Sequence, residues 1–194
     1  MELPQCRVAI FASGAGSNAK NFCHYFKDHP QVHISLLLTN NGESGVPAIA
    51  GEYGIPYLVF NREEFFTSDK VLQRLLSHEI TLIILAGFLW LVPTQIISIY
   101  EDRIINIHPA LLPKYGGKGM YGMNVHKAVI EHHEKKSGIT IHLVNEYYDK
   151  GKILAQYEIN VDGSDTPELL AQKIHHLEHT YFPKVVEHYA LNII

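Results

Sequence analysis

The chain has 194 residues, of which 46% are hydrophobic and 19% charged, and its formal net charge is −4. This length suits one domain with a substantial core, so we predict a single domain over residues 1–194. The mild negative charge argues against nucleic-acid binding, which requires a basic surface. No apolar run approaches the ~20 residues that cross a bilayer, so no membrane segment is expected.

The N-terminal residues lack the basic and apolar regions of a secretion signal, which favours a cytoplasmic location. The two cysteines, Cys6 and Cys23, are far apart and belong to no metal-binding motif. We therefore expect reduced thiols in the core and neither a disulfide nor a metal pair.

The first half of the chain alternates apolar runs with segments of helical spacing, which predicts strands and helices in turn. In chain order, we expect a strand at 7–13, a helix at 18–28, a strand at 32–39, a helix at 47–53, a strand at 56–60, a helix at 62–78, a strand at 81–86, a helix at 93–100 and a strand at 103–108. Nearly continuous apolar strands between helices indicate a parallel sheet that is covered on both faces.

The pattern changes after residue 109. Residues 115–123 contain four glycines and predict a mobile loop. A helix is expected at 124–135, the arms of a hairpin at 140–144 and 153–161, and a final helix from Thr166, where Thr166 or Asp165 can act as the cap before Pro167 in the first turn. The predicted fold class is therefore α/β: a doubly wound, mostly parallel sheet with an antiparallel C-terminal hairpin and a long C-terminal helix.

A glycine-rich turn at residues 13–18 follows the first predicted strand. It can be interpreted as a dinucleotide fingerprint, but no acid or arginine stands at the end of the second strand, where such a site needs one. The N–H groups of Gly16, Ser17 and Asn18 at a positive helix end suit a single phosphate better. A tight turn without a ligand is the alternative.

Polar side chains also gather at the end of the strand predicted at 103–108. Asn106 and His108 are two residues apart, so they share one face of that strand. Pro109 ends the strand, at the sheet edge where open α/β sheets bind ligands. Asp149, in the turn of the predicted hairpin, can reach the same edge. An amide, an imidazole and a carboxylate together can stabilise an oxyanion and move a proton, although an Asn-x-His pair alone is more often structural.

These residues resemble those of the folate-dependent glycinamide ribonucleotide formyltransferases of purine biosynthesis. The resemblance runs in order over nearly the whole chain. The matching segments are Ser13-Gly14-x-Gly16-Ser17-Asn18, Leu85-Ala86-Gly87-Phe88, Asn106-Ile107-His108-Pro109-x-Leu111-Leu112-Pro113-Lys114-Tyr115, Gly138-x-Thr140-Ile141-His142 with Asp149-x-Gly151, and Glu178-His179 with Pro183.

The resemblance implies that the amine of glycinamide ribonucleotide attacks the formyl carbon of 10-formyltetrahydrofolate, with no acyl-enzyme and no metal. His108 and Asn106 would donate to the oxyanion that forms. Asp149 would orient His108 and favour its protonated form. His108, or a water held by it and Asp149, would pass the amine proton to the departing folate nitrogen.

The expected protein is a cytoplasmic enzyme that is a monomer or weak homodimer. The resemblance also implies where its two substrates bind. Gly16, Ser17 and Asn18 would hold the ribose phosphate, and Glu178 the glycinamide end. The folate pocket would be lined by Leu89, Trp90, Leu91, Val92 and Asn106, with residues 145–150 around the pterin. Ordinary core packing is the alternative for 89–92, above all for Leu91.

The chain also departs from the family pattern. Trp90 stands where many relatives carry a basic or polar residue, and a family arginine has no clean counterpart near 68–70. The loop at 114–123 is longer than usual and is expected to cover the substrate phosphate, with Lys118 as a contact. His175 and His179 have a zinc-compatible spacing, but no further ligand completes a site, so no metal is expected.

The rival functions are related formyltransferases that act on methionyl-tRNA or sugar nucleotides, and the hydrolase that removes the formyl group. A phosphate-binding module without catalysis is the rival from another class. Such a module would have no use for Asn106, His108 and Asp149 together.

Overall fold

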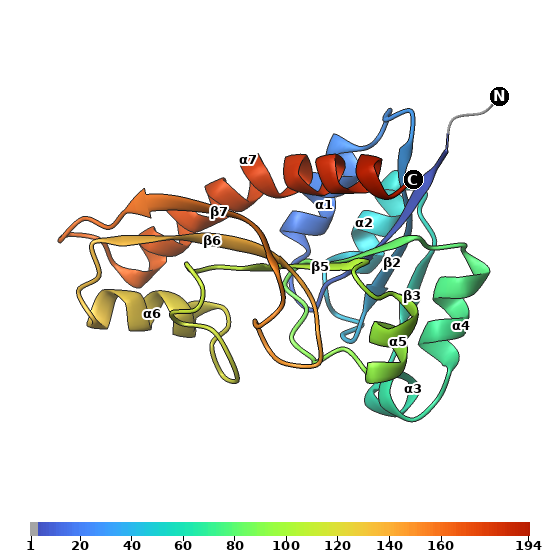
Figure 1. Cartoon of the computed structure of the whole chain (residues 1–194), viewed down its shortest axis with the longest axis horizontal. Coiled ribbons are helices and arrows are strands. Elements are labelled where there is room, and N and C mark those ends of the chain that lie inside the picture. The colour runs from blue at the N-terminus through green and yellow to red at the C-terminus, as the bar shows by residue number, and fades with distance from the viewer. Residues whose placement is uncertain (1–3) are drawn as a thin grey trace.

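The computed structural model describes residues 4–194, and Met1–Leu3, part of the segment that predicts a cytoplasmic location, lies outside this range. Seven strands form one sheet with helices on both faces (Figure 1). In chain order the elements are β1 (Cys6–Phe11), α1 (Ser17–Tyr25), β2 (Val32–Thr39), α2 (Val46–Tyr53), β3 (Tyr57–Val59), α3 (Arg62–Phe66), α4 (Lys70–Ser77), β4 (Leu82–Leu85), α5 (Thr94–Ile99), β5 (Ile104–His108), α6 (Met123–Glu131), β6 (Lys136–Leu143), β7 (Ile153–Asn160) and α7 (Pro167–Ile193).

The strand order is β3-β2-β1-β4-β5-β6-β7. Strands β1 to β5 pair in parallel, whereas β6 and β7 are antiparallel to their neighbours. The predicted fold class is therefore confirmed, including the C-terminal hairpin and the long final helix.

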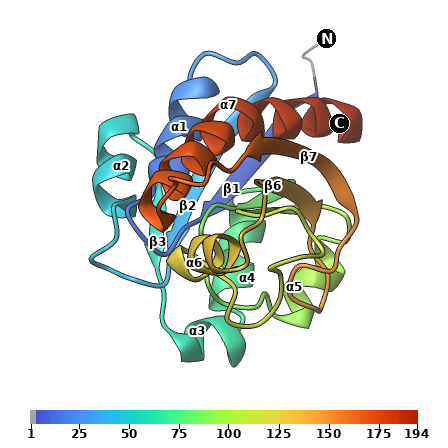
Figure 2. The same cartoon turned by 90° about the vertical axis from the view of Figure 1, so that its left-hand side faces the viewer.

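The sheet has helices on both faces (Figure 2), and each face carries its own hydrophobic core. Helices α1, α2 and α7 cover one face, where Phe22 and Phe182 meet edge to face with ring centroids 4.9 Å apart. Helices α3, α4 and α5 cover the other face, around an aromatic group that includes Phe11, Phe60 and Phe65. Both cysteines are buried and free, as predicted.

The helices predicted at 18–28 and 124–135 end earlier, at Tyr25 and Glu131, and two further elements differ more from the structure. The helix expected at 62–78 is two helices, because Asn61 and Glu64 form a capping box that starts α3 and the chain turns at 67–69 before α4 begins. The first hairpin arm starts at Lys136 and not at residue 140, since Lys136 already pairs with Asn160. A Cβ at Gly138 would lie 2.0 Å from the Tyr157 carbonyl oxygen, so the close approach of these strands requires glycine there.

The topology brings distant segments to one edge of the sheet. Strand order reverses at β1, between β2 and β4, and crevices form at such reversals beyond the carboxyl ends of parallel strands. The glycine-rich turn follows β1, and Asn106 and His108 end β5, so both predicted sites open at this edge. No helix within residues 4–194 is both long and apolar enough to cross a membrane.

Candidate active site

A cavity of about 700 Å³ opens at this edge, and most of the predicted site residues lie in its wall. The wall includes Asn18 from α1, residues 87–92 after β4, Asn106 and His108 from β5, residues 117–122, His126 from α6, His142 from β6, Asp149, and His175 and Glu178 from α7. Segments from both ends of the chain thus meet around one volume of substrate size.

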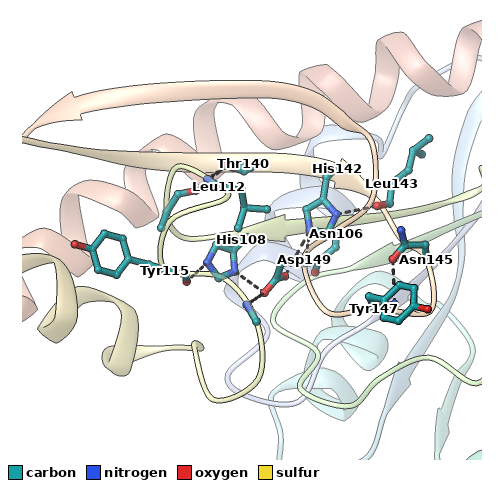
Figure 3. A network of polar contacts seen from close by, with 12 residues as sticks. Asn106, His108, Leu112, Tyr115, Thr140, His142, Leu143, Asn145, Tyr147 and Asp149 are labelled. Atoms are coloured by element: carbon teal, nitrogen blue, oxygen red, sulfur yellow. Dashed lines mark hydrogen bonds and ion pairs between the residues drawn. The ribbon is translucent and has the colours of Figure 1, made fainter.

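Asn106 is oriented by a histidine on the neighbouring strand. Asn106 and His142 are directly paired residues of β5 and β6, and Asn106 Nδ2 lies 3.1 Å from His142 Nε2 (Figure 3). His142 Nδ1 donates to the Leu143 carbonyl oxygen at 2.8 Å, so its Nε2 is the acceptor for the amide. One N–H of Asn106 is used in this way, and the other is left for a ligand.

His108 is held at both ring nitrogens. Its Nε2 donates to the Tyr115 carbonyl oxygen at 2.7 Å, and its Nδ1 lies 3.5 Å from Asp149 Oδ2 (Figure 3). The same carboxylate oxygen accepts the Gly117 N–H at 2.8 Å, while Oδ1 lies 3.6 Å from His142 Nε2. The structure therefore brings the predicted trio of Asn106, His108 and Asp149 together, with His142 between Asn106 and Asp149.

The segment that follows β5 is fixed by Thr140. Its hydroxyl donates to the Ala110 carbonyl oxygen at 2.7 Å and accepts the Leu112 N–H at 3.0 Å. These bonds hold the chain between His108 and Tyr115, so the carbonyl that binds His108 has a defined position.

Burial has the largest effect on the pKa of His108. Desolvation lowers the pKa of His108 below its ordinary value, although the nearby Asp149 carboxylate and the hydrogen bond to Tyr115 raise it. Asp149 acts on His108 as predicted, but burial outweighs it and favours the neutral ring. Burial also raises the pKa of Asp149, yet His142, the Gly117 N–H and His108 outweigh this, so its pKa falls below the ordinary value and the carboxylate stays ionised.

The glycine-rich turn contributes Asn18 to the cavity. Asn18 Nδ2 donates to Glu178 Oε2 at 2.8 Å, and its Oδ1 is buried without a hydrogen-bond partner in residues 4–194. Gly16 has a left-handed backbone (φ 75°) at the start of α1, and Ser17 is exposed beside it. Gly16 and Ser17 are not part of the cavity wall. Of the three residues predicted to bind a phosphate, only Asn18 therefore lines this cavity.

Another part of the cavity wall is apolar. Leu89, Trp90, Leu91 and Val92 all line it, and Leu89 is 49% exposed, which a residue of the core would not be. The Arg62 guanidinium lies 5.2 Å from the Trp90 ring centroid, although Arg62 was not among the predicted site residues. A flat aromatic ligand suits this part of the wall.

Sequence reasoning missed three contributors. His142 belonged to a matching segment without a role, and only the β5–β6 register reveals its contact with Asn106. The Tyr115 carbonyl acts through backbone geometry, which no side-chain pattern encodes. His126 lines the cavity from α6 and carried no sequence signal. Within residues 4–194, no group of three or more His, Cys, Asp or Glu side chains has the geometry to hold a metal ion.

Comparisons with known proteins agree on one family. A family model described as formyl transferase matches residues 6–186. A phosphoribosylglycinamide formyltransferase from Bacillus subtilis is 34% identical, and the match covers 93% of each chain. The crystal structure of phosphoribosylglycinamide formyltransferase from Anaplasma phagocytophilum superposes with a TM-score of 0.87 at 34% identity, covering 96% of this chain and 87% of that one.

A chloroplastic phosphoribosylglycinamide formyltransferase from Arabidopsis thaliana is 42% identical over 93% of this chain. The chain spans 64% of the length of that protein and 60% of the length of a second plant relative, from Vigna unguiculata.

Proposed function

Because the chain belongs to the formyl transferase family, we propose that it transfers the formyl group of 10-formyltetrahydrofolate to the amine of glycinamide ribonucleotide. The products are formylglycinamide ribonucleotide and tetrahydrofolate, in purine biosynthesis. The observation that carries this proposal is one cavity whose wall combines Asn106, His108 and Asp149 with the polar side chains of Asn18 and Glu178 and the apolar residues 89–92. The names of the Bacillus and Anaplasma relatives agree with it.

In the proposed reaction, the amine nitrogen attacks the formyl carbon and the carbonyl oxygen gains negative charge. The free N–H of Asn106 is placed to donate to that oxygen, because His142 fixes the amide. His108 can join as a donor only by exchanging its bond with the Tyr115 carbonyl. When the tetrahedral intermediate collapses, the bond between the formyl carbon and the folate nitrogen breaks. The amine loses a proton, which His108, or a water held by His108 and Asp149, passes to the departing folate nitrogen.

Substrate positions follow from the polar and apolar parts of the cavity wall. Asn18 and Glu178 are proposed to contact the ribonucleotide, with Gly16 and Ser17 offering first-turn N–H groups to its phosphate. The folate is proposed to lie along 89–92, with 145–150 around the pterin. The predicted roles of these residues, the cytoplasmic location and the monomeric or weakly dimeric state stay predictions.

The experiment mixes purified protein with glycinamide ribonucleotide and 10-formyltetrahydrofolate, and follows tetrahydrofolate release by absorbance with an amine-free control. Release that requires the ribonucleotide supports the proposal. Release without it indicates the hydrolase, and no release with intact ribonucleotide binding favours another acceptor or the binding module.

A second measurement tests the assigned centre. The variant His108→Ala should bind the ribonucleotide nearly as wild type does and lose turnover by ~10²–10³ or more. A His24→Ala control changes an exposed histidine on α1 and should leave turnover intact. If His108→Ala retained turnover, the assigned centre would be wrong.

A further inference from the structure

His126 is a buried histidine in the wall of the cavity. The residue is 5% exposed, and it lines the same volume as His108 and Glu178. Its Nδ1 is fully buried and has no hydrogen-bond partner in the described part of the chain. A buried polar nitrogen without a partner costs free energy that a bound ligand can recover, so this position indicates a substrate contact.

The surroundings of His126 keep its ring neutral. Burial, the largest effect, lowers the pKa of His126; Glu178 on α7 raises it, and His108 on β5 lowers it. The net pKa lies below the ordinary value, so near pH 7 the ring carries a lone pair. The other titratable side chains in the cavity wall are Lys118, Tyr121, His142, Tyr147, Tyr148, Asp149 and His175.

His108, in contrast, has both ring nitrogens directed at groups of the protein. Its Nε2 is bonded to the Tyr115 carbonyl oxygen, and its Nδ1 faces Asp149. The cavity wall contains four histidines, His108, His126, His142 and His175, and within residues 4–194 only His126 among them has no hydrogen bond to the protein.

Other groups in the wall of the same cavity accept hydrogen bonds. Asn18 Oδ1 is buried without a partner, and the Glu178 carboxylate accepts from Asn18 Nδ2 and lies 3.4 Å from His175 Nδ1. With the neutral His126 ring, the cavity wall presents several acceptors and suits a ligand group rich in N–H donors. An ammonium group has three such donors.

We propose that His126 is the base that takes a proton from the ammonium form of the acceptor substrate, an inference that rests on the proposed function. An α-amino group has a pKa of about 7.7–8.0, so most of the substrate arrives as an ammonium that cannot attack. One N–H bond of the ammonium breaks and one forms at His126. The amine then attacks, its second proton goes to the departing folate nitrogen, and His126 returns its proton to solvent.

The test compares the pH dependence of kcat/KM in the wild type and in His126→Gln, which keeps a hydrogen-bonding side chain but cannot titrate. At pH 6.5 the variant should be slower by roughly tenfold or more, because little free amine is present. At pH 9 solvent supplies the free amine, so the deficit should shrink to about twofold. His24→Gln, on an exposed histidine of α1, should follow the wild type throughout.

A merely structural role for His126 would lower activity by the same factor at every pH, and that result, or an absence of any deficit, would overturn the proposal. A wild-type enzyme that fails to formylate the ribonucleotide would instead overturn the proposed function. The two failures are therefore distinguishable.

A second measurement is read from the wild-type protein, and a variant is needed only to assign one signal. In wild-type protein with isotope-labelled histidine, adding the ribonucleotide alone at pH 6.5 should convert one buried neutral imidazole signal to the imidazolium form in NMR spectra. His126→Asn serves to assign that signal. If every buried histidine kept its protonation state on binding, His126 would not be the acceptor of the proton.

Discussion

Asn18 and Glu178, 160 residues apart in the sequence, share a hydrogen bond of 2.8 Å between Nδ2 and Oε2. This bond joins the glycine-rich turn after β1 to the C-terminal helix. The two predicted contacts for the ribonucleotide thus form one surface, and the position of Asn18 depends on Glu178.

Replacing Glu178 should therefore weaken binding of the ribonucleotide and leave binding of the folate unchanged. In Glu178→Ala the carboxylate is lost and Asn18 loses its acceptor, so we expect KM for the ribonucleotide to rise by about tenfold or more. KM for 10-formyltetrahydrofolate should change little. Steady-state kinetics with each substrate varied in turn measures both, with Glu101→Ala, an exposed residue, as the control. Equal rises in both constants would refute the assignment.

Asn106→Ala removes the amide that His142 orients. If its free N–H donates to the oxyanion, kcat should fall by ~10²–10³ with little change in either KM. His142→Ala should give a smaller loss of kcat, because the amide stays but is no longer fixed. Single-turnover kinetics separates this chemical step from product release. A variant whose KM rises while its kcat is preserved would show that Asn106 only binds.

Acid should destabilise the protein through its buried histidines. The folded-state pKa values of His108 and His126 are lowered, so their contribution is present above the unfolded value of about 6.5 and is lost as pH falls through the folded values. The raised pKa of His175 acts in the opposite direction. In urea unfolding between pH 7.5 and 5, His126→Gln should lose stability less steeply than the wild type, by at most about 1.4 kcal/mol per pH unit. Parallel curves would contradict the assigned burial effect.

Trp90 offers a direct signal of folate binding, because it is the single tryptophan and lines the apolar part of the cavity wall. Its fluorescence should change on titration with a folate and much less with the ribonucleotide. Trp90→Phe should raise KM for 10-formyltetrahydrofolate several-fold, since the smaller ring offers less contact area and is a weaker cation–π partner for Arg62. A fluorescence response to the ribonucleotide alone would show that the ribonucleotide binds beside Trp90, where the folate is proposed to lie.

The core beneath α7 should tolerate truncation poorly. Phe182 is fully buried against Phe22, so Phe182→Ala should lower the free energy of unfolding by about 3–5 kcal/mol. Leu191→Ala, on the same helix but 40% exposed, should change it by no more than about 0.5 kcal/mol. Chemical denaturation with constant m values provides the comparison, and similar losses in both variants would be inconsistent with the described core.

The sequence predicts the order of strands and helices well, because apolar period and glycine or proline punctuation are local signals. The break between α3 and α4 escaped prediction, since the apolar spacing continues through it while the capping box at Asn61 acts over only three residues. The early start of β6 escaped as well, because pairing of Lys136 with Asn160 is a tertiary contact.

In the candidate site, too, local patterns identify some residues and tertiary contacts reveal the others. Asn106 and His108 are polar residues near the end of a strand, and Asp149 lies in the turn between two strands, which a pattern can identify. The partnership of His142 with Asn106 depends on antiparallel register, and the hydrogen bond to His108 comes from a backbone carbonyl, which every residue has. His126 becomes notable only through its burial and missing partner.

The short segment from Tyr115 to Gly117 binds both members of the histidine–aspartate pair, through the Tyr115 carbonyl on His108 and the Gly117 N–H on Asp149. Tyr115 itself is anchored outside the cavity, where its hydroxyl donates to Glu134. Lifting this segment would release His108 and Asp149 in the same movement. The arrangement of His108 and Asp149 therefore depends on the position of a backbone segment that leads directly into the glycine-rich loop.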